Sequence, residues 1–345
     1  MHQPRVLIIS PAQANANNGN WQTAWRWSRM LRPAFQTQIA QAWDGEPFEV
    51  MLALHARRSA ASIAAWARAR GANANAPGLA VVLTGTDLYR DIQTDASAQT
   101  SLVLAQRLVL LQECGPEALP VALRDKARVI FQSVTPRQTA VKPQGHLRVV
   151  MVGHLREEKS PQTLFAAARL LQDHPDIWID HIGAALDEEL AEQARACAAE
   201  CPNYRWLGGL PHEATRRRIQ RAHLLVHASR MEGGAHVVME AVCSGTPVLA
   251  SRIAGNVGML GPSYAGYFEL GDAPGLADLL LRCRREQMRS GAPLAATEPA
   301  GTEGLLYRLL QAQCAQRAPL FAPAAEQAAL RALVHELLPA SAKLG

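Results

Sequence analysis

The sequence has few lysines and no long apolar run. Lysine occurs four times in 345 residues, at Lys126, Lys142, Lys159 and Lys343, although 35 residues are basic. No apolar stretch approaches the roughly 18 to 20 residues that a membrane helix needs. The first ten residues, MHQPRVLIIS, are too short and too strand-like for a signal peptide. We therefore expect a cytoplasmic protein without a membrane partner. Lysine is also much rarer than arginine among its basic residues.

Several metal and cofactor motifs are also absent. The six cysteines are scattered without a Cys-x-x-Cys pair or a matching histidine pair, which excludes a disulfide framework and a structural zinc site. There is no Gly-x-Gly-x-x-Gly, so a dinucleotide-binding oxidoreductase is a distant alternative. There is no Asp-x-Asp to hold a metal on a nucleotide diphosphate. We expect no metal and no bound cofactor.

Composition indicates a folded protein that handles small anions. Hydrophobic residues make up 48% of the chain and charged residues 19%, which is ordinary for globular proteins. The formal net charge is +5 and the pI is about 9.0, without a basic tail or arm. This distribution favours anionic small molecules over nucleic acid as partners.

Short β-rich runs alternate with longer helical patterns, which is typical of βα units that build a parallel sheet. A polar, proline-containing segment at 135–146 separates two such series and predicts a domain boundary. We predict an α/β protein with two Rossmann-like domains facing across a cleft, at 1–138 and 146–320, and a C-terminal helix at 321–345 that packs back toward the first domain. The predicted strands are 5–10, 48–55, 79–85, 107–112, 127–133, 147–155, 178–183, 204–210, 223–229 and 247–252.

The strongest motif is SRMEGGAHVVMEAVCSGTPVLAS at 229–251, where Glu232 and Glu240 flank a Gly-Gly pair. Gly233 and Gly234 allow close approach of a ligand to the backbone, and the helix predicted after them offers N–H groups to a phosphate. The two glutamates lie about two helical turns apart and can accept hydrogen bonds from sugar hydroxyls. A capped helix with an acidic first turn would give the same spacing, but the flanking strand and the GTPV turn favour a nucleotide-sugar site.

This motif resembles the Glu-x7-Glu signature of GT-B glycosyltransferases of group 1, which use nucleotide-sugar donors. The resemblance implies that Glu232 lies near the donor sugar and that Glu240 binds the ribose. VGHLREEK at 152–159 is similar to the family's VGRL-x3-K element, so Lys159 falls at its diphosphate lysine. The family's arginine is replaced by His154, for which Arg156 is a candidate substitute. The resemblance adds Gly208 and Leu210 as base-binding candidates and Gly19 as a donor-side glycine.

Two neighbouring strand ends carry concentrated polarity and predict the acceptor site. LALHARRS at 52–59 and LTGTDLYRD at 83–91 follow apolar runs, so their polar residues should meet at one edge of the sheet. Guanidinium groups pair with phosphate-like groups, and we expect an anionic acceptor. Solvent-facing arginines and helix capping by Thr86 or Asp87 would explain the same residues without a ligand. The acceptor candidates are Arg57, Arg58, Thr84, Thr86, Asp87 and Arg90, with Arg252 and Asn256 after a later strand.

The blocks ALHARRSA, LTGTDLYRD, VGHLREEKSP and ASRIAGNVGML resemble a branch of this family, the selenosugar synthases of selenoneine biosynthesis. The resemblance implies transfer of a sugar, N-acetylglucosamine, from a UDP-sugar to the selenium of selenophosphate, and a functional link to other enzymes of that pathway. Selenium is already a strong nucleophile, so no general base is required. His55 stands among the catalytic candidates with Glu232, Lys159 and Arg156, although it need not remove a proton.

Two other hypotheses fit the same sequence. An ordinary metal-independent glycosyltransferase would act on a hydroxyl and would need a base. A non-catalytic nucleotide-sugar-binding module would share the fold without turnover, although nothing in the sequence marks the site as inactive.

Overall fold

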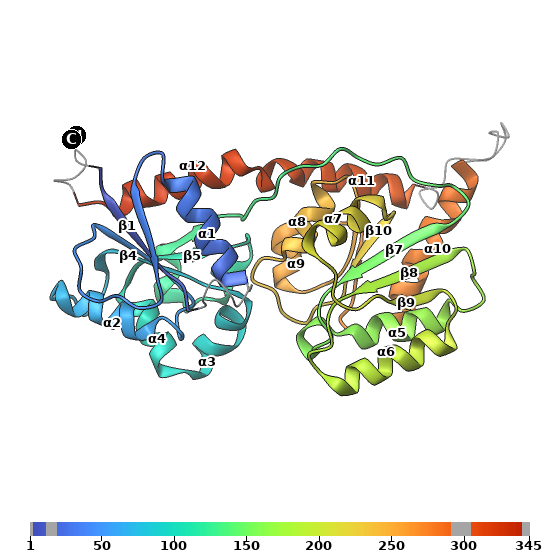
Figure 1. Cartoon of the computed structure of the whole chain (residues 1–345), viewed down its shortest axis with the longest axis horizontal. Coiled ribbons are helices and arrows are strands. Elements are labelled where there is room, and N and C mark those ends of the chain that lie inside the picture. Colours follow the sequence, from blue (N-terminus) through green and yellow to red (C-terminus); the bar gives the residue numbers. More distant parts are fainter. Residues whose placement is uncertain (1–2, 12–18, 291–304, 340–345) are drawn as a thin grey trace. The chain divides into compact units, whose positions relative to one another are not determined.

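The computed structural model describes residues 3–11, 19–290 and 305–339, with the side chains of residues 289 and 290 excepted. The chain forms two compact units (Figure 1). Unit 1 comprises residues 1–132 and 323–345, and unit 2 comprises residues 133–322. The sequence placed the divisions at 138–146 and at 320/321, a few residues from these positions.

Unit 1 contains a six-stranded parallel sheet in the order β2-β1-β3-β4-β5-β6. A π-helical turn, η2 (Asp87–Asp91), follows β4. The remaining elements are β1 (Arg5–Ile9), α1 (Gly19–Leu31), β2 (Gln36–Ala40), β3 (Val50–Leu54), α2 (Ala60–Ala69), β4 (Ala76–Val82), α3 (Ile92–Thr94), α4 (Ala96–Leu104), β5 (Ala105–Leu110), η3 (Gly115–Ala118), η4 (Val121–Lys126), β6 (Ala127–Val129) and α12 (Pro323–Leu337).

Alternate residues of the strands in unit 1 enter two apolar cores. Val6 and Ile8 face α1 and α12, where Trp27 and Leu330 are fully buried. Leu7 faces the opposite core, which α2 and α4 cover. Both faces of a parallel sheet must be covered, which explains why the strands are nearly continuous apolar runs. The C-terminal helix α12 therefore belongs to the core of unit 1, although it is the last element of the chain.

Unit 2 contains a second six-stranded parallel sheet, in the order β12-β11-β10-β7-β8-β9. Its elements are β7 (Leu147–Val152), η5 (Glu157–Lys159), α5 (Pro161–Leu170), β8 (Ile177–Ile182), α6 (Glu188–Glu200), β9 (Tyr204–Trp206), α7 (His212–Arg221), β10 (Leu224–His227), α8 (His236–Val242), β11 (Val248–Ser251), α9 (Ala254–Leu260), β12 (Tyr267–Phe268), α10 (Ala273–Ser290), α11 (Leu306–Arg317) and η7 (Ala318–Phe321).

The two parallel sheets with helices confirm the predicted α/β class, but the predicted strands need three corrections. The run at 127–133 forms only β6, because its later residues leave the sheet. The run at 204–210 forms only β9, because the two glycines that follow leave the ladder. The sequence also missed two edge strands: the half-exposed β2, whose residues QTQIA lack an apolar pattern, and β12, which has only two residues. Within the described part of the chain, no helix is long and apolar enough to cross a membrane.

Candidate functional site

The centre of the site in unit 2 is an ion pair between Lys159 and Glu232. The Lys159 ammonium contacts Glu232 Oε1, and their side chains keep exposed fractions of 16% and 12%. The two residues follow β7 and β10, which are neighbours in the sheet. They therefore meet at the edge where the strands of an open α/β sheet end and where such folds bind ligands. An ion pair that keeps some exposure can be split by a ligand that offers both a phosphate and a hydroxyl group.

Local geometry brings Lys159 to this edge. The chain turns through η5 after β7, and Ser160 takes a left-handed conformation with φ of 46° before α5 begins. The methylene chain of Lys159 crosses Gly153, where an added Cβ would lie 3.2 Å from Lys159 Cγ. The Arg230 N–H donates to Glu158 O over 2.9 Å, which ties this turn to the loop that carries Glu232.

The loop that carries Glu232 is also held by close packing against α9 and by a hydrogen bond between the ends of β10 and β11. A Cβ at Gly255 would lie 2.2 Å from Glu232 O, so α9 can approach this loop only with glycine at that position. Ser251 donates to Ser229 O over 2.6 Å and joins the ends of β10 and β11. The orientation of Glu232 thus depends on three strand ends and not on its own loop alone.

Behind Glu232 lies a buried histidine that also contacts its carboxylate. His227 Nε2 is 3.3 Å from Glu232 Oε1, and His227 Nδ1 is 2.9 Å from Asn256 Oδ1. The Asn256 amide donates to Ser251 O over 2.8 Å, which fixes the orientation of its side chain. Asn256 is fully buried and supports His227, and its contact with an acceptor stays a prediction.

The charged groups around Glu232 determine the pKa of its carboxylate. Burial alone would raise the pKa of Glu232, but the Lys159 ammonium and the hydrogen bond from His227 outweigh burial and hold this pKa well below its ordinary value. Burial, Arg156 and Lys159 together lower the pKa of His154. At neutral pH the site therefore presents an ionised Glu232 as a hydrogen-bond acceptor and a neutral His154.

Glu240 occupies a separate buried position on α8. Its Oε1 is 2.7 Å from His212 Nε2 and 3.8 Å from Arg216 Nε, and both partners lie on α7. The Glu240 carboxylate is thus paired, although the His212 side chain is 76% exposed and can move away when a ligand approaches.

The structure places the other predicted donor residues at the same edge of unit 2. His154 is exposed and accepts a hydrogen bond from the Ala184 N–H over 3.0 Å. Arg156 is exposed, with only a 3.9 Å contact to Glu158. Gly208 has φ of +66° and its carbonyl accepts from the Gly183 N–H over 2.8 Å. Leu210 is half-buried beyond it.

The Gly-Gly pair and Arg252 differ from expectation in detail. Gly233 and Gly234 lie in a bend, and α8 begins two residues later at His236 and has only seven residues. They therefore lie in the loop between Glu232 and α8 and are not the first residues of the helix. The Arg252 guanidinium lies over the Tyr267 ring, 5.3 Å from its centroid.

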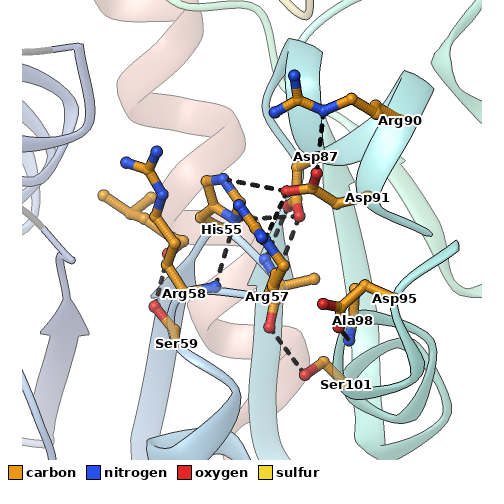
Figure 2. A network of polar contacts seen from close by, with 12 residues as sticks. His55, Arg57, Arg58, Ser59, Asp87, Arg90, Asp91, Asp95, Ala98 and Ser101 are labelled. Carbon is orange, nitrogen blue, oxygen red and sulfur yellow. Dashed lines mark hydrogen bonds and ion pairs between the residues drawn. The ribbon is translucent and has the colours of Figure 1, made fainter.

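In unit 1 the predicted acceptor residues gather around buried His55 (Figure 2). His55 Nδ1 is 3.1 Å from Asp87 Oδ1, and His55 Nε2 is 3.7 Å from Asp91 Oδ2. His55 has φ of 73°, a strained conformation for a residue with a side chain. The Ala56 N–H donates to Asp87 Oδ2 over 2.7 Å and stabilises this turn. Asp87 is fully buried and contacts His55 and the Ala56 N–H, so its contact with an acceptor stays a prediction.

Asp91 anchors two arginines whose side chains reach the surface. Arg57 Nε is 3.0 Å from Asp91 Oδ2, and Arg90 Nε is 3.3 Å from Asp91 Oδ1. Their side chains are 41% and 54% exposed. Since each arginine uses Nε toward Asp91, its terminal nitrogens stay available to an anion (Figure 2).

Three further predicted residues surround this cluster. Arg58 is exposed, and its backbone N–H lies 3.4 Å from His55 Nδ1. Thr84 and Thr86 are half-buried, and the Thr86 side chain makes no capping hydrogen bond to η2.

The donor-side candidate Gly19 begins α1, and the part of its predicted loop at 12–18 lies outside the described residues.

One group of described residues has the spacing of metal ligands, namely His55, Asp87 and Asp91. The ligand atoms of this group already have partners. His55 contacts Asp87, Asp87 accepts a hydrogen bond from the Ala56 N–H, and Asp91 contacts the Arg57 guanidinium. An added cation would have to displace a guanidinium from Asp91. The cluster therefore fits an ion-pair network better than a metal site, and independence from metals stays a prediction.

Residues 135–280 match the family model "Glycosyl transferases group 1". The matched segment contains Lys159, Glu232 and Glu240, and together with the fold it supports the family that the sequence predicted.

Solved structures share the fold across both units. Sucrose-phosphate synthase from Thermosynechococcus elongatus superposes with a TM-score of 0.68 at 15% identity, over 97% of this chain and 99% of that one. HepE from Anabaena in complex with UDP gives 0.67 at 15% identity, over 96% and 99%. A mutant of TarM from S. aureus gives 0.57 at 13% identity, over 83% of this chain but only 55% of TarM. These likenesses confirm the predicted GT-B fold.

Sequence reasoning missed several members of the two centres. His212, Arg216, Gly255 and Asp91 were not singled out. The signal for Asp91 was present in TDLYRD, because residues four apart on a helix share one face. No signal pointed to Gly255, since its importance arises from a neighbour 23 positions away in sequence, Glu232.

Proposed function

We propose that this protein is a glycosyltransferase that moves N-acetylglucosamine from UDP-N-acetylglucosamine to the selenium of selenophosphate. The selenium attacks the anomeric carbon, a C–Se bond forms, and the C–O bond to the diphosphate breaks. UDP leaves with the bonding electrons. Water then cleaves the Se–P bond. Phosphate is released, and the selenosugar is the product.

The Lys159–Glu232 pair is the observation that carries the donor half of this proposal. A UDP-sugar would separate the pair, because its diphosphate attracts the Lys159 ammonium while its sugar hydroxyls donate to Glu232. His227 would keep a hydrogen bond on Glu232 when Lys159 turns away. The family match over this segment and the UDP in the HepE structure support the choice of a nucleotide-sugar donor.

Charge that develops on the leaving UDP would be stabilised by side chains. Lys159 and Arg156 supply two cations at one edge of the sheet, which would take the place of a metal ion on the diphosphate. The Glu240 carboxylate, which His212 and Arg216 contact, would accept hydrogen bonds from the ribose hydroxyls.

Unit 1 supports an anionic acceptor that is already nucleophilic. Arg57 and Arg90 present guanidinium groups held in place by buried Asp91, which suits a phosphate-like group. His55 has an exposed fraction of only 3%, and both of its ring nitrogens face carboxylates. Such a histidine is poorly placed to take a proton from an alcohol, whereas selenophosphate needs no base.

Mass spectrometry of reactions with UDP-N-acetylglucosamine tests this proposal. We expect a selenosugar and UDP when selenophosphate is the acceptor, with activity that persists in EDTA. Transfer to alcohols but not to selenophosphate would instead indicate a hydroxyl-directed glycosyltransferase. UDP binding by calorimetry without turnover on selenium, sulfur or oxygen acceptors would indicate a binding module, and loss of activity in EDTA would contradict the metal-independent mechanism.

A further inference from the structure

Unit 2 has a second concave region that the proposed reaction does not use. A cavity of about 690 Å³ lies between α7 and strands β7, β8 and β9. We call it the arginine groove, because five of the side chains that line it are arginines: Arg148, Arg205, Arg217, Arg218 and Arg221.

The topology of the sheet explains why this groove exists. The connections β7-α5-β8 and β8-α6-β9 advance in one direction, so right-handed crossovers place α5 and α6 on one face. The chain then returns from β9 to β10 through α7, which therefore lies on the opposite face and packs against β7 (Figure 1). Because α7 alone must cover three strands there, β8 and β9 keep exposed side chains such as Trp178, at 38%, and Arg205.

The register of the strands brings the side chains on that face into pairs across neighbouring strands, and several of these side chains are charged. Arg148 of β7 pairs with Trp178 of β8, and Asp180 of β8 pairs with Arg205 of β9. Residues two apart on a strand point to the same face, so Trp178 and Asp180 both enter the groove. Arg148 and Trp178 lie near the amino ends of their strands, whereas Lys159 and Glu232 follow carboxyl ends.

The carboxylates in the groove are already neutralised. Asp180 is buried and contacts Arg205 at 2.6 Å and Arg218 at 2.9 Å. Glu213 contacts Arg137 and, at 3.0 Å, Arg217. Among the described residues, neither Arg148 nor Arg221 is paired with a carboxylate. The groove therefore carries an excess of positive charge, with two guanidinium groups lacking an acidic partner.

The other lining residues fit the carbon part of a small molecule. Trp178, Pro211 and Ala214 supply apolar surface beside the arginines. The Trp178 ring is held in place by stacking on His146, with centroids 3.8 Å apart and planes 15° apart. The volume lies within the range of small-molecule sites, and a guanidinium fork matches the geometry of a phosphate group.

From these observations we infer that the arginine groove binds a small molecule that carries phosphate groups, at a site separate from the donor site of unit 2. None of the residues that line the groove belongs to the proposed donor or acceptor sites. The inference does not depend on the proposed reaction, because it concerns binding to a different face of the unit.

Calorimetric titration with inorganic tripolyphosphate tests the groove. The full chain would first be saturated with UDP at physiological ionic strength, so that the diphosphate position of the donor site is blocked and weak surface attraction is screened. We expect saturable binding with one equivalent, and a Trp178 fluorescence change that is lost in Trp178→Phe. Citrate serves as a carboxylate probe of similar charge and should bind more weakly.

The double variant Arg148→Ala/Arg221→Ala should weaken tripolyphosphate binding by about tenfold or more, because each charge-assisted contact contributes strongly. The control Arg169→Ala/Arg195→Ala removes the same charge from α5 and α6 on the other face and should leave binding unchanged. Equal losses in both variants, absence of saturable binding, or binding that UDP competes away would each overturn the inference. Circular dichroism and UDP binding would show that each variant is folded.

Discussion

Both units of this protein place a histidine beside a carboxylate at the carboxyl ends of parallel strands, but the two centres differ in which charged groups they expose. In unit 2 the carboxylate of Glu232 and the ammonium of Lys159 keep exposed fractions of 12% and 16%. In unit 1 the side chains of Asp87 and Asp91 are 0% and 6% exposed, while the arginines they support reach the surface. Unit 2 can therefore offer a ligand both an acceptor and a cation, whereas unit 1 offers cations alone.

Under the proposed function, this difference would assign the two halves of the transfer reaction to the two units. A sugar diphosphate has hydroxyl donors and an anionic leaving group, which match the pair in unit 2. A small anion matches the guanidinium groups of unit 1. The same kind of polar cluster would then serve a different ligand according to which of its charges is buried.

The largest effect that tests this comparison should come from Lys159→Ala. The interaction of Lys159 with the diphosphate strengthens as negative charge develops on UDP, so kcat should fall by about 100-fold or more while donor affinity changes little. Steady-state kinetics and calorimetry with UDP-sugar measure the two quantities. Arg195→Ala, which removes a remote cation from α6, is the control. A change confined to KM would remove Lys159 from this role.

Acid should act on unit 2 through two buried histidines. Burial lowers the pKa of His181 and of His223 to about 4. The unfolded chain takes up protons near pH 6.5 and the folded unit does not, so stability is complete above pH 6.5 and declines as pH falls toward 4, by up to about 3 kcal/mol for each group.

Hydrogen exchange at pH 7 and pH 5, corrected for the intrinsic rates, measures this loss for peptides of unit 2. His223→Asn should flatten the dependence on pH even though it lowers stability at pH 7. An unchanged slope in this variant would mean that His223 takes up a proton as readily in the folded protein as in the unfolded chain.

Gly255→Ala tests whether close packing orients Glu232. The added Cβ would lie 2.2 Å from Glu232 O, so the loop must shift at a cost of about 1 to 3 kcal/mol. We expect weaker UDP-sugar binding together with a lower midpoint of thermal unfolding. Gly145→Ala is a matched control, because a Cβ there meets nothing within 4 Å. Normal donor binding by a destabilised Gly255→Ala protein would separate packing from orientation.

The smallest expected effect belongs to Asp91→Asn in unit 1. Without the charge that anchors Arg57 and Arg90, the KM for an anionic acceptor should rise by about tenfold, with donor affinity unchanged. Initial rates at varied selenophosphate concentration give the KM, and calorimetry gives the donor affinity. If the donor affinity fell instead, the assignment of the two ligands to the two units would be incorrect.

Sequence patterns located the polar residues at the strand ends better than they predicted the contacts that these residues make. Lys159 and Glu232 could be found because a rare lysine and a Glu-x7-Glu spacing follow apolar strands, and such local signals survive in a linear sequence. Asp87 and Asn256 had the same kind of signal, yet both are fully buried. Their surroundings include residues that are distant in sequence, such as His227 beside Asn256 and Ala56 beside Asp87.

Local patterns along the chain are sufficient to predict the α/β class, the two series of strands and the edge of each sheet where polar residues collect, because alternation of strands and helices requires only local periodicity. The contact of Asn256 with His227 and the pairing of Asp91 with Arg57 become visible only in the folded chain. Each of these depends on which strands become neighbours, and pairing in a parallel sheet joins segments that are far apart along the chain.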